Sequence, residues 1–181
     1  MKKWLIILLL FPFSCIAQIY KYIGVEDGLS NRRVYSIQKD RKGYMWFLTH
    51  EGIDRYNGKE FKQYKLMDGK EEVNSLLNLN WLYIDTEGVL WEIGKKGKVY
   101  RYDKAHDTFE LVYKLPVVEN KDMPAPVSYS YIDNSHTIWL CCEKSIYLYD
   151  TKSQDTTEIA NAIDETITDL SLIHISEPTR L

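Results

Sequence analysis

A tryptophan that recurs along the chain constrains the fold of this sequence more than any other feature. Trp46, Trp91 and Trp139 follow one another with a nearly constant spacing of about 45 residues. An aspartate stands six positions before each tryptophan, and a tyrosine followed by Asn or Asp stands ten or eleven positions after it. A period of this length indicates a repeat architecture in which each unit packs against the next. The repeated positions are Asp40, Gly43, Trp46, Tyr56, Asp85, Gly88, Trp91, Tyr102, Asp133, Trp139 and Tyr149.

Each repeat is predicted to form four short antiparallel strands. The stretch Val34 to Asp40 mixes β-branched and aromatic residues at strand length. The segments 40–43 and 85–88 are typical of hairpin turns, because Asp can bond the turn backbone and Gly supplies positive φ. Four strands in each such period match one blade of a β-propeller. The recurring tryptophans should then pack between neighbouring blades.

The predicted fold class is therefore all-β, a partial β-propeller of three four-stranded antiparallel blades with the start of a fourth. No helix of note is expected. Three blades do not close a ring, because propellers use about four to eight. The expected organisation is blade 1 in residues 18–68, blade 2 in 69–116, blade 3 in 117–162 and the beginning of blade 4 in 163–169.

The segment 1–17 is predicted to be a signal peptide. Two lysines follow Met1, the apolar run Trp4 to Phe13 comes next, and Cys15 and Ala17 supply small residues before a cut at Gln18. The run falls short of the roughly 20 residues of a membrane span. The alternatives are an uncleaved anchor and a lipoprotein acylated at Cys15. In each case the chain is expected to leave the cytoplasm.

The C-terminal segment 170–181 is interpreted as an artefact. Leu170 to Arg180 reads as the in-frame translation of a transposase adapter used in sequencing libraries. The alternative is a natural strand followed by a polar tail. We expect this segment, His174 included, to carry no biology, and the reading frame to have run off a DNA fragment.

Composition excludes some classes of function. The chain has 181 residues, 45% of them hydrophobic, and a formal net charge of -3. That balance argues against a nucleic-acid partner bound through a broad basic face. His50, His106 and His136 are scattered, and no paired Cys or His spacing suggests zinc. The sequence therefore predicts no catalytic residue, no cofactor and no metal.

Other patterns have plain structural interpretations. The adjacent Cys141 and Cys142 should point to opposite faces of a strand, which makes a disulfide between them unfavourable. The segment 94–98 resembles a phosphate loop superficially, but it is predicted to be a charged hairpin turn between two strands. Ser30, His50 and Asp54 could be drawn as a triad, although no motif supports one.

Aromatic side chains are where a sugar could stack. The alternative, which we favour, is that the same residues pack between blades. Arg32 and Arg33 lie in a predicted loop and could face a ligand or only solvent. The candidate ligand-binding residues are Trp81, Tyr83, Tyr129 and Tyr131.

The repeat resembles the two-component regulator propeller repeat of periplasmic sensors in Bacteroidetes-type bacteria. Blade 2 lacks one Thr of the pattern and has Gly94 there, and blade 3 has His136 for Gly and Cys142 for Thr. The resemblance covers roughly residues 19–169. The matching stretches of blade 1 are Glu26-Asp-Gly-Leu-Ser-Asn31, Val34-Tyr-Ser-Ile37, Asp40-x-x-Gly43, Met45-Trp46, Thr49-His-Glu-Gly-Ile53 and Arg55-Tyr-Asn-Gly58.

What the resemblance implies extends beyond this chain. Such proteins usually carry two propellers, a further β domain, one membrane span and a cytoplasmic histidine kinase, and many add a receiver and a helix-turn-helix domain. The expected function is the N-terminal, non-enzymatic part of an extracytoplasmic propeller that senses a small molecule or an oligosaccharide. The parent is expected to be anchored through a downstream span in the inner membrane, and to be dimeric. The alternatives are the propeller of a secreted glycan-active enzyme and a non-catalytic scaffold.

Overall fold

The computed structural model of the protein describes residues 21–73, 79–117 and 124–160. Within these ranges lie three four-stranded antiparallel sheets, each a meander in sequence order, which we call blades 1, 2 and 3. Blade 1 comprises β1 (Val34–Lys39), β2 (Met45–Thr49), β3 (Gly52–Tyr56) and β4 (Phe61–Tyr64). Blade 2 comprises β7 (Leu79–Ile84), β8 (Leu90–Gly94), β9 (Lys98–Asp103) and β10 (Thr108–Lys114). Blade 3 comprises β11 (Val127–Ile132), β12 (Thr137–Cys142), β13 (Ser145–Asp150) and β14 (Thr156–Ala160).

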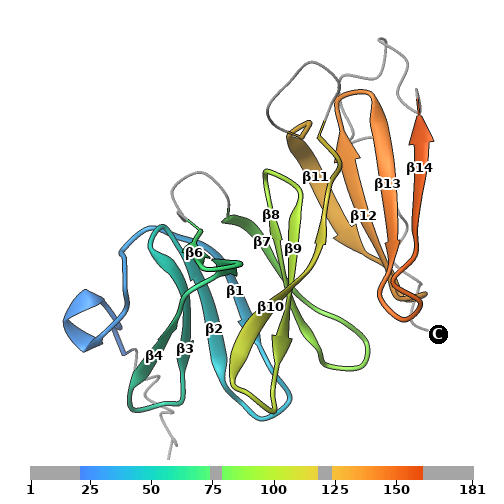
Figure 1. Ribbon diagram of the computed structural model, residues 1–181. Coiled ribbons are helices and arrows are strands. Elements are labelled where there is room, and N and C mark those ends of the chain that lie inside the picture. The colour runs from blue at the N-terminus through green and yellow to red at the C-terminus, as the bar shows by residue number, and fades with distance from the viewer. Residues whose placement is uncertain (1–20, 74–78, 118–123, 161–181) are drawn as a thin grey trace, which may run out of the picture.

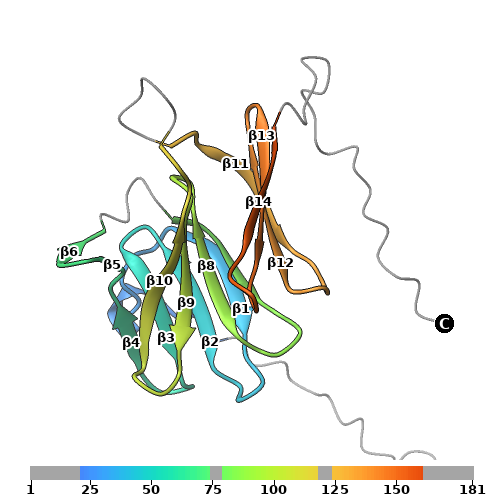
Figure 2. The ribbon, with the colours of Figure 1, turned by 45° about the vertical axis from the view of Figure 1, so that its right-hand side comes forward.

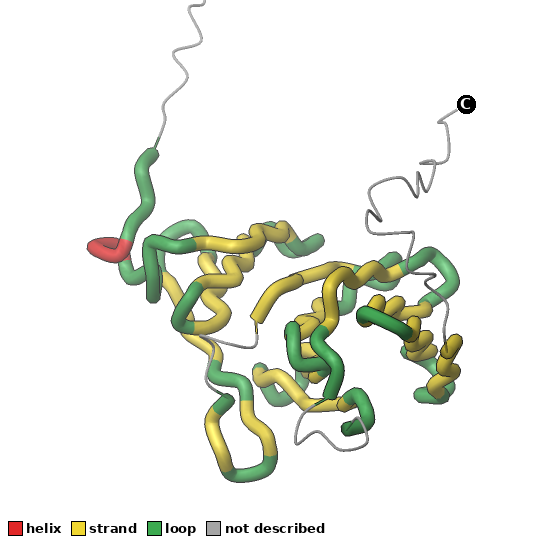
Figure 3. Tube along the Cα trace, turned by 90° about the horizontal axis from the view of Figure 1, so that it is seen from above, coloured by secondary structure: helices red, strands yellow, loops and turns green. Residues whose placement is uncertain are grey.

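The blades follow one another as an open series. Figure 1 shows blade 2 between blades 1 and 3, and the view from above in Figure 3 shows that the described part of the chain does not close a ring. The predicted all-β class and the partial propeller are confirmed. The predicted signal peptide, the start of a fourth blade and the adapter tail lie outside the described residues.

Two small elements were not expected from the sequence. A 3₁₀ turn, η1 (Val25–Asp27), precedes β1. The strands β5 (Met67–Asp68) and β6 (Glu71–Glu72) form a hairpin in the connection from blade 1 to blade 2, and Figure 2 shows it projecting outward from the blades. Asp68 of this hairpin is ion-paired with Lys98, at 2.7 Å, and with Lys114. The hairpin therefore ties the connection after blade 1 to blade 2.

The same aspartate and tryptophan form a hydrogen-bonded unit in every blade. Asp40 Oδ1 accepts bonds from two turn amides, at 2.9 and 3.0 Å, and its Oδ2 accepts the indole N–H of Trp46 at 3.0 Å. The arrangement recurs between Asp85 and Trp91, and between Asp133 and Trp139, with indole bonds of 2.9 Å. The predicted Asp turn is confirmed, and the indole bond explains the constant spacing between aspartate and tryptophan.

The Gly position of this turn requires left-handed backbone. Gly43 and Gly88 have φ of 90° and 84°, and His136 occupies the same place in blade 3 at 67°. A side chain in this region costs roughly 1 kcal/mol or more. At this turn, blade 3 therefore carries local strain that blades 1 and 2 avoid by using glycine.

Two apolar cores form between the blades. Trp46 is 1% exposed in the first core, which joins blade 1 to Leu82, Leu90 and Phe109 of blade 2. Trp91 lies in the second core with Ile138, Leu140 and other residues of blade 3. Trp139 stays partly exposed, because the described residues place no further blade against it. The expected packing of tryptophans between blades is thus confirmed at both interfaces.

The inner strands of neighbouring blades are also joined by side-chain hydrogen bonds. Gln38 of β1 donates to the Leu82 carbonyl oxygen of β7 at 2.9 Å. Tyr83 of β7 donates to the Ser130 carbonyl oxygen of β11 at 2.6 Å. These bonds fix the height of each blade relative to the next.

A carboxylic acid is buried in the first interface. Glu92 of β8 pairs with Leu82 and Tyr100 across the sheet, and both of those residues belong to the core shared with blade 1. Glu92 is 0% exposed, and among the described residues neither of its oxygens has a hydrogen-bond partner. Burial therefore raises the pKa of Glu92 well above its usual range.

Removing the turn aspartate should destabilise a blade most where its tryptophan is buried. We expect Asp85→Ala to lower the free energy of unfolding by about 1–3 kcal/mol, because the buried Trp91 N–H loses its acceptor. Asp133→Ala is the matched control, since water can reach the partly exposed Trp139. Urea unfolding followed by tryptophan fluorescence measures both, and equal losses would contradict the role given to burial.

The buried acid should make stability fall as the pH rises. The folded chain retains a proton on Glu92 that the unfolded chain releases above the ordinary glutamate value of about 4.3. Stability attributable to this residue is thus complete below that pH and declines above it. We expect Glu92→Gln to gain stability over the original chain progressively from pH 4 to pH 8 in urea unfolding. The exposed Glu71→Gln is the control, and a constant difference across this range would refute the prediction.

Candidate functional site

A groove of about 350 Å³ opens between blades 1 and 2. The Asp–Trp turn of blade 1 forms one wall and the equivalent turn of blade 2 forms the other, because both blades present these turns at the same end. The lining residues are Asp40, Arg41, Lys42, Tyr44, Trp46, Arg55, Glu87, Gly88, Val89, Leu90, Tyr102 and Lys104. Four of these side chains are basic and two are acidic, so the groove has a positive lining.

The basic groups of the groove differ in how they are held. Arg41 crosses to the neighbouring turn and donates from Nη2 to the Thr86 carbonyl oxygen at 2.5 Å. A Cβ placed on Gly88 would make only an ordinary contact with the Arg41 side chain, at 3.4 Å, so this glycine is required by its φ of 84° and not by the crossing. Lys42 and Lys104 are exposed, and no ion pair joins their ammonium groups to an acid among the described residues.

Arg55 forms the back of the groove and is neutralised. Its Nη1 lies 3.0 Å from Asp107 Oδ1 and donates to the Tyr102 hydroxyl at 2.8 Å. The Tyr64 hydroxyl also donates to Asp107 Oδ1, at 2.6 Å. Lys62 adds a second ion pair and, with these other hydrogen bonds, holds the pKa of Asp107 below its usual range against the effect of burial. This cluster clamps blade 1 to the β9–β10 turn of blade 2.

Different contacts occupy the equivalent positions at the interface between blades 2 and 3. The residue of blade 3 equivalent to Asp107 is Gln154. Both have left-handed backbone, with φ of 53° at Asp107 and 64° at Gln154. Tyr113 and Tyr149 stack with ring centroids 5.0 Å apart and planes 22° apart. Arg101 turns to Glu110 of its own blade, at 3.2 Å. An aromatic stack thus replaces the charged clamp.

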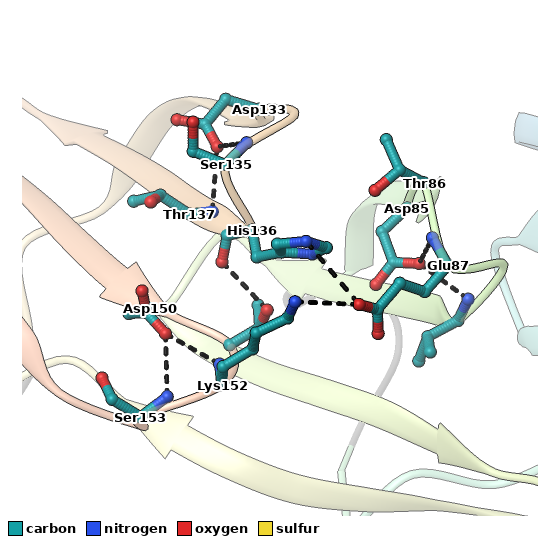
Figure 4. Close-up of polar contacts among 12 residues, drawn as sticks. Asp85, Thr86, Glu87, Asp133, Ser135, His136, Thr137, Asp150, Lys152 and Ser153 are labelled. Atoms are coloured by element: carbon teal, nitrogen blue, oxygen red, sulfur yellow. Dashed lines mark hydrogen bonds and ion pairs between the residues drawn. The ribbon is translucent and has the colours of Figure 1, made fainter.

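The turns of blades 2 and 3 are bridged by an acid. Figure 4 shows the carboxylate of Glu87 reaching from the blade 2 turn to two groups of blade 3. Its Oε1 lies 3.0 Å from Lys152 Nζ and 3.6 Å from His136 Nε2. The His136 carbonyl oxygen accepts the Thr151 amide and hydroxyl, both at 2.9 Å, which holds the blade 3 turns together.

A second hollow, of about 400 Å³, lies at blade 1 near β3. Asp54 is buried there, and its Oδ2 accepts the amide and the hydroxyl of Ser30, at 2.9 and 2.6 Å. The Ser30 hydroxyl also lies 2.7 Å from Thr49 Oγ1. Burial raises the pKa of Asp54, and the bonds from Ser30 partly offset that rise. These contacts secure the segment before β1 against blade 1.

The triad drawn from the sequence is not assembled. Ser30 and Asp54 meet directly, whereas the Nδ1 of His50 lies 2.9 Å from the Tyr35 hydroxyl. No imidazole therefore stands between serine and acid in the described contacts. The contact between Ser30 and Asp54 is a structural hydrogen bond.

The remaining predicted residues are distributed along inner strands. Trp81 and Tyr83 lie on β7 and pack against the second core. Tyr131 lies on β11 opposite Trp139, and Tyr129, on the same strand, is 48% exposed. None of the four lines the groove between blades 1 and 2. Their role as ligand-binding residues stays a prediction.

The cysteines and the charged turn agree with their structural interpretation. Cys141 and Cys142 are both buried and both free, so each fills apolar space. The segment 94–98 is a hairpin turn, with the Gly97 amide bonded to the Gly94 carbonyl oxygen at 2.9 Å.

One grouping of possible metal ligands was not visible in the sequence. Asp103, His106 and Glu110 place ligand atoms within 4.8 Å of one another on the β9–β10 hairpin. The pairing of β9 with β10 brings Glu110 back toward Asp103, which spacing alone does not reveal. His106 is already ion-paired with Asp103, and Glu110 with Arg101. The three groups therefore act as surface ion pairs.

In the described part of the chain, no helix is long and apolar enough to cross a membrane.

Comparison with known proteins identifies the repeat. Residues 28–51 match the family model described as two component regulator propeller. A search of the curated proteins finds no match.

Solved structures with the same fold include two extracellular domains from B. thetaiotaomicron. The domain assigned to the hybrid two component system BT3049 is 24% identical, with a TM-score of 0.60 over 77% of this chain and 20% of that chain. The domain assigned to BT4673 is 20% identical, with a TM-score of 0.61 over 78% of this chain and 18% of that chain. The chain thus spans about a fifth of the solved chains. Residues 28–51 are a two component regulator propeller repeat, in a chain that shares its fold with extracellular domains of hybrid two component systems.

Proposed function

We propose that this chain is the N-terminal part of an extracytoplasmic propeller that senses a ligand for a two-component system. The observation that carries the proposal is the match of residues 28–51 to the regulator propeller model. The fold shared with the two extracellular domains supports the same assignment. The predicted export signal and a periplasmic location agree with it.

The inter-blade groove gives this function a physical basis. A ligand held between the turns at Arg41 and Gly88 would contact two blades at once. Binding would then favour those arrangements of blades 1 and 2 in which both walls reach the ligand. A shift of this kind is what a sensor must pass to the rest of its protein. We propose a small molecule or an oligosaccharide as the ligand, and a kinase beyond a downstream membrane span as the recipient.

The proposed role of this segment is binding without catalysis. Among the described residues, the acid and the serine that meet, Asp54 and Ser30, serve to hold the chain before β1. The groove contains basic and aromatic groups, and its Asp40 carboxylate is engaged by three N–H donors. These groups suit recognition of a ligand better than proton transfer.

Recovery of the complete gene tests the proposal. Resequencing through the codons for residues 170–181 should reveal further propeller blades, then a membrane span and histidine kinase motifs. Ligand addition should change the autophosphorylation rate of the complete protein, measured with labelled ATP. A catalytic glycan-active domain downstream, or an early stop codon, would refute the sensor assignment in favour of an enzyme or a scaffold.

A further inference from the structure

The groove between blades 1 and 2 has a basic side chain at the turn position where the interface between blades 2 and 3 has the bridging acid Glu87. We propose that it binds an anionic saccharide, whose carboxylate or sulfate lies between Lys42 and Lys104. The saccharide part of this inference rests on the proposed ligand-sensing function. The anionic part rests on a comparison of the two interfaces within this chain.

The bridge between blades 2 and 3 shows what the groove lacks. Lys42 occupies the same position of the Asp–Trp turn as Glu87, two residues after the aspartate in each case. Glu87 uses that position to place a carboxylate beside Lys152 and His136 of the next blade. At the first interface the position carries an ammonium group instead.

The partner side of the first interface is basic as well. Lys104 belongs to the β9–β10 turn of blade 2, and Lys152 belongs to the equivalent β13–β14 turn of blade 3. Both lysines therefore stand on the blade that follows the variable turn position. Lys42 and Lys104 line one groove. The first interface therefore has a lysine on the following blade, as the second has Lys152, but a lysine in place of the Glu87 carboxylate.

No acid of the groove is available to supply that charge. The Asp40 oxygens are occupied by two turn amides and the Trp46 indole. Glu87 is paired with blade 3, and Asp107 is committed to Arg55 and Lys62. An anion from solution that enters the groove would meet the two ammonium groups and the Arg41 guanidinium, all of which line it.

The size and the walls of the groove suit a sugar. About 350 Å³ lies at the lower end of the range for small-molecule sites. Tyr44, with Arg55 packed over its ring, and Tyr102, packed against Trp46, also line the groove, so a pyranose ring held there would meet aromatic groups beside the charged ones.

Matched pairs of saccharides test the proposal on the full chain. The probes are trigalacturonate with its methyl ester, and a sulfated chondroitin disaccharide with its unsulfated form, measured by isothermal titration calorimetry. We expect at least one charged member to bind about tenfold or more tightly than its neutral partner, and its affinity to fall with added salt. The two pairs distinguish a carboxylate from a sulfate as the recognised group.

Three variants locate the site. Lys42→Ala combined with Lys104→Ala should weaken binding of the charged saccharide about tenfold or more. Lys42→Glu should abolish binding without lowering the melting temperature, because the new carboxylate can pair with Lys104 as Glu87 pairs with Lys152. Lys59→Ala, in the exposed β3–β4 turn, should leave binding unchanged. Circular dichroism confirms that each variant is folded.

Distinct outcomes overturn the inference. Equal binding of charged and neutral saccharides removes the anionic part and leaves the sensor function intact. Charged binding that survives Lys42→Glu places the site elsewhere. Tighter binding of an oligoglutamate peptide replaces the saccharide with an acidic protein. Absence of binding to all four saccharides refutes the site, whereas the downstream gene sequence decides the sensor function independently.

Discussion

The bond from a turn carboxylate to an indole N–H sets the geometry of every blade. In each blade one aspartate accepts bonds from backbone amides of the turn between the first two strands. It also accepts the indole N–H of the tryptophan six residues later. The turn thereby determines which way the large ring points. Because that ring forms the core with the next blade, a local hydrogen bond decides how the blades stack.

The two interfaces between blades differ chemically, although all three blades share this Asp–Trp unit. The first combines a buried acid, a charged clamp around Asp107 and a hairpin held by Asp68. The second relies on stacked tyrosines and the Glu87 bridge. Blades of one design therefore meet through unlike contacts.

Much of the fold could be predicted from the sequence because its signals are local. Strand composition, the Asp turn and the period of the tryptophans each act within one blade, and the strands lie where these signals place them. The groove could not be predicted, because it depends on which side chains of two blades face each other. Arg41 and Thr86 are far apart in the sequence, and only the stacking brings them into contact. Glu92 was missed for the same reason, since a single charged residue in a strand usually faces solvent.

The two residues that follow the aspartate in each Asp–Trp turn are positions where the sequence can vary between blades. Their side chains take no part in the carboxylate–indole bond, which uses only backbone amides and the tryptophan. Arg41 and Lys42, Thr86 and Glu87, and Asn134 and Ser135 can therefore differ without disturbing that bond. Duplicated blades keep a common skeleton while these paired sites diversify, so new recognition surfaces can arise with little risk to the scaffold.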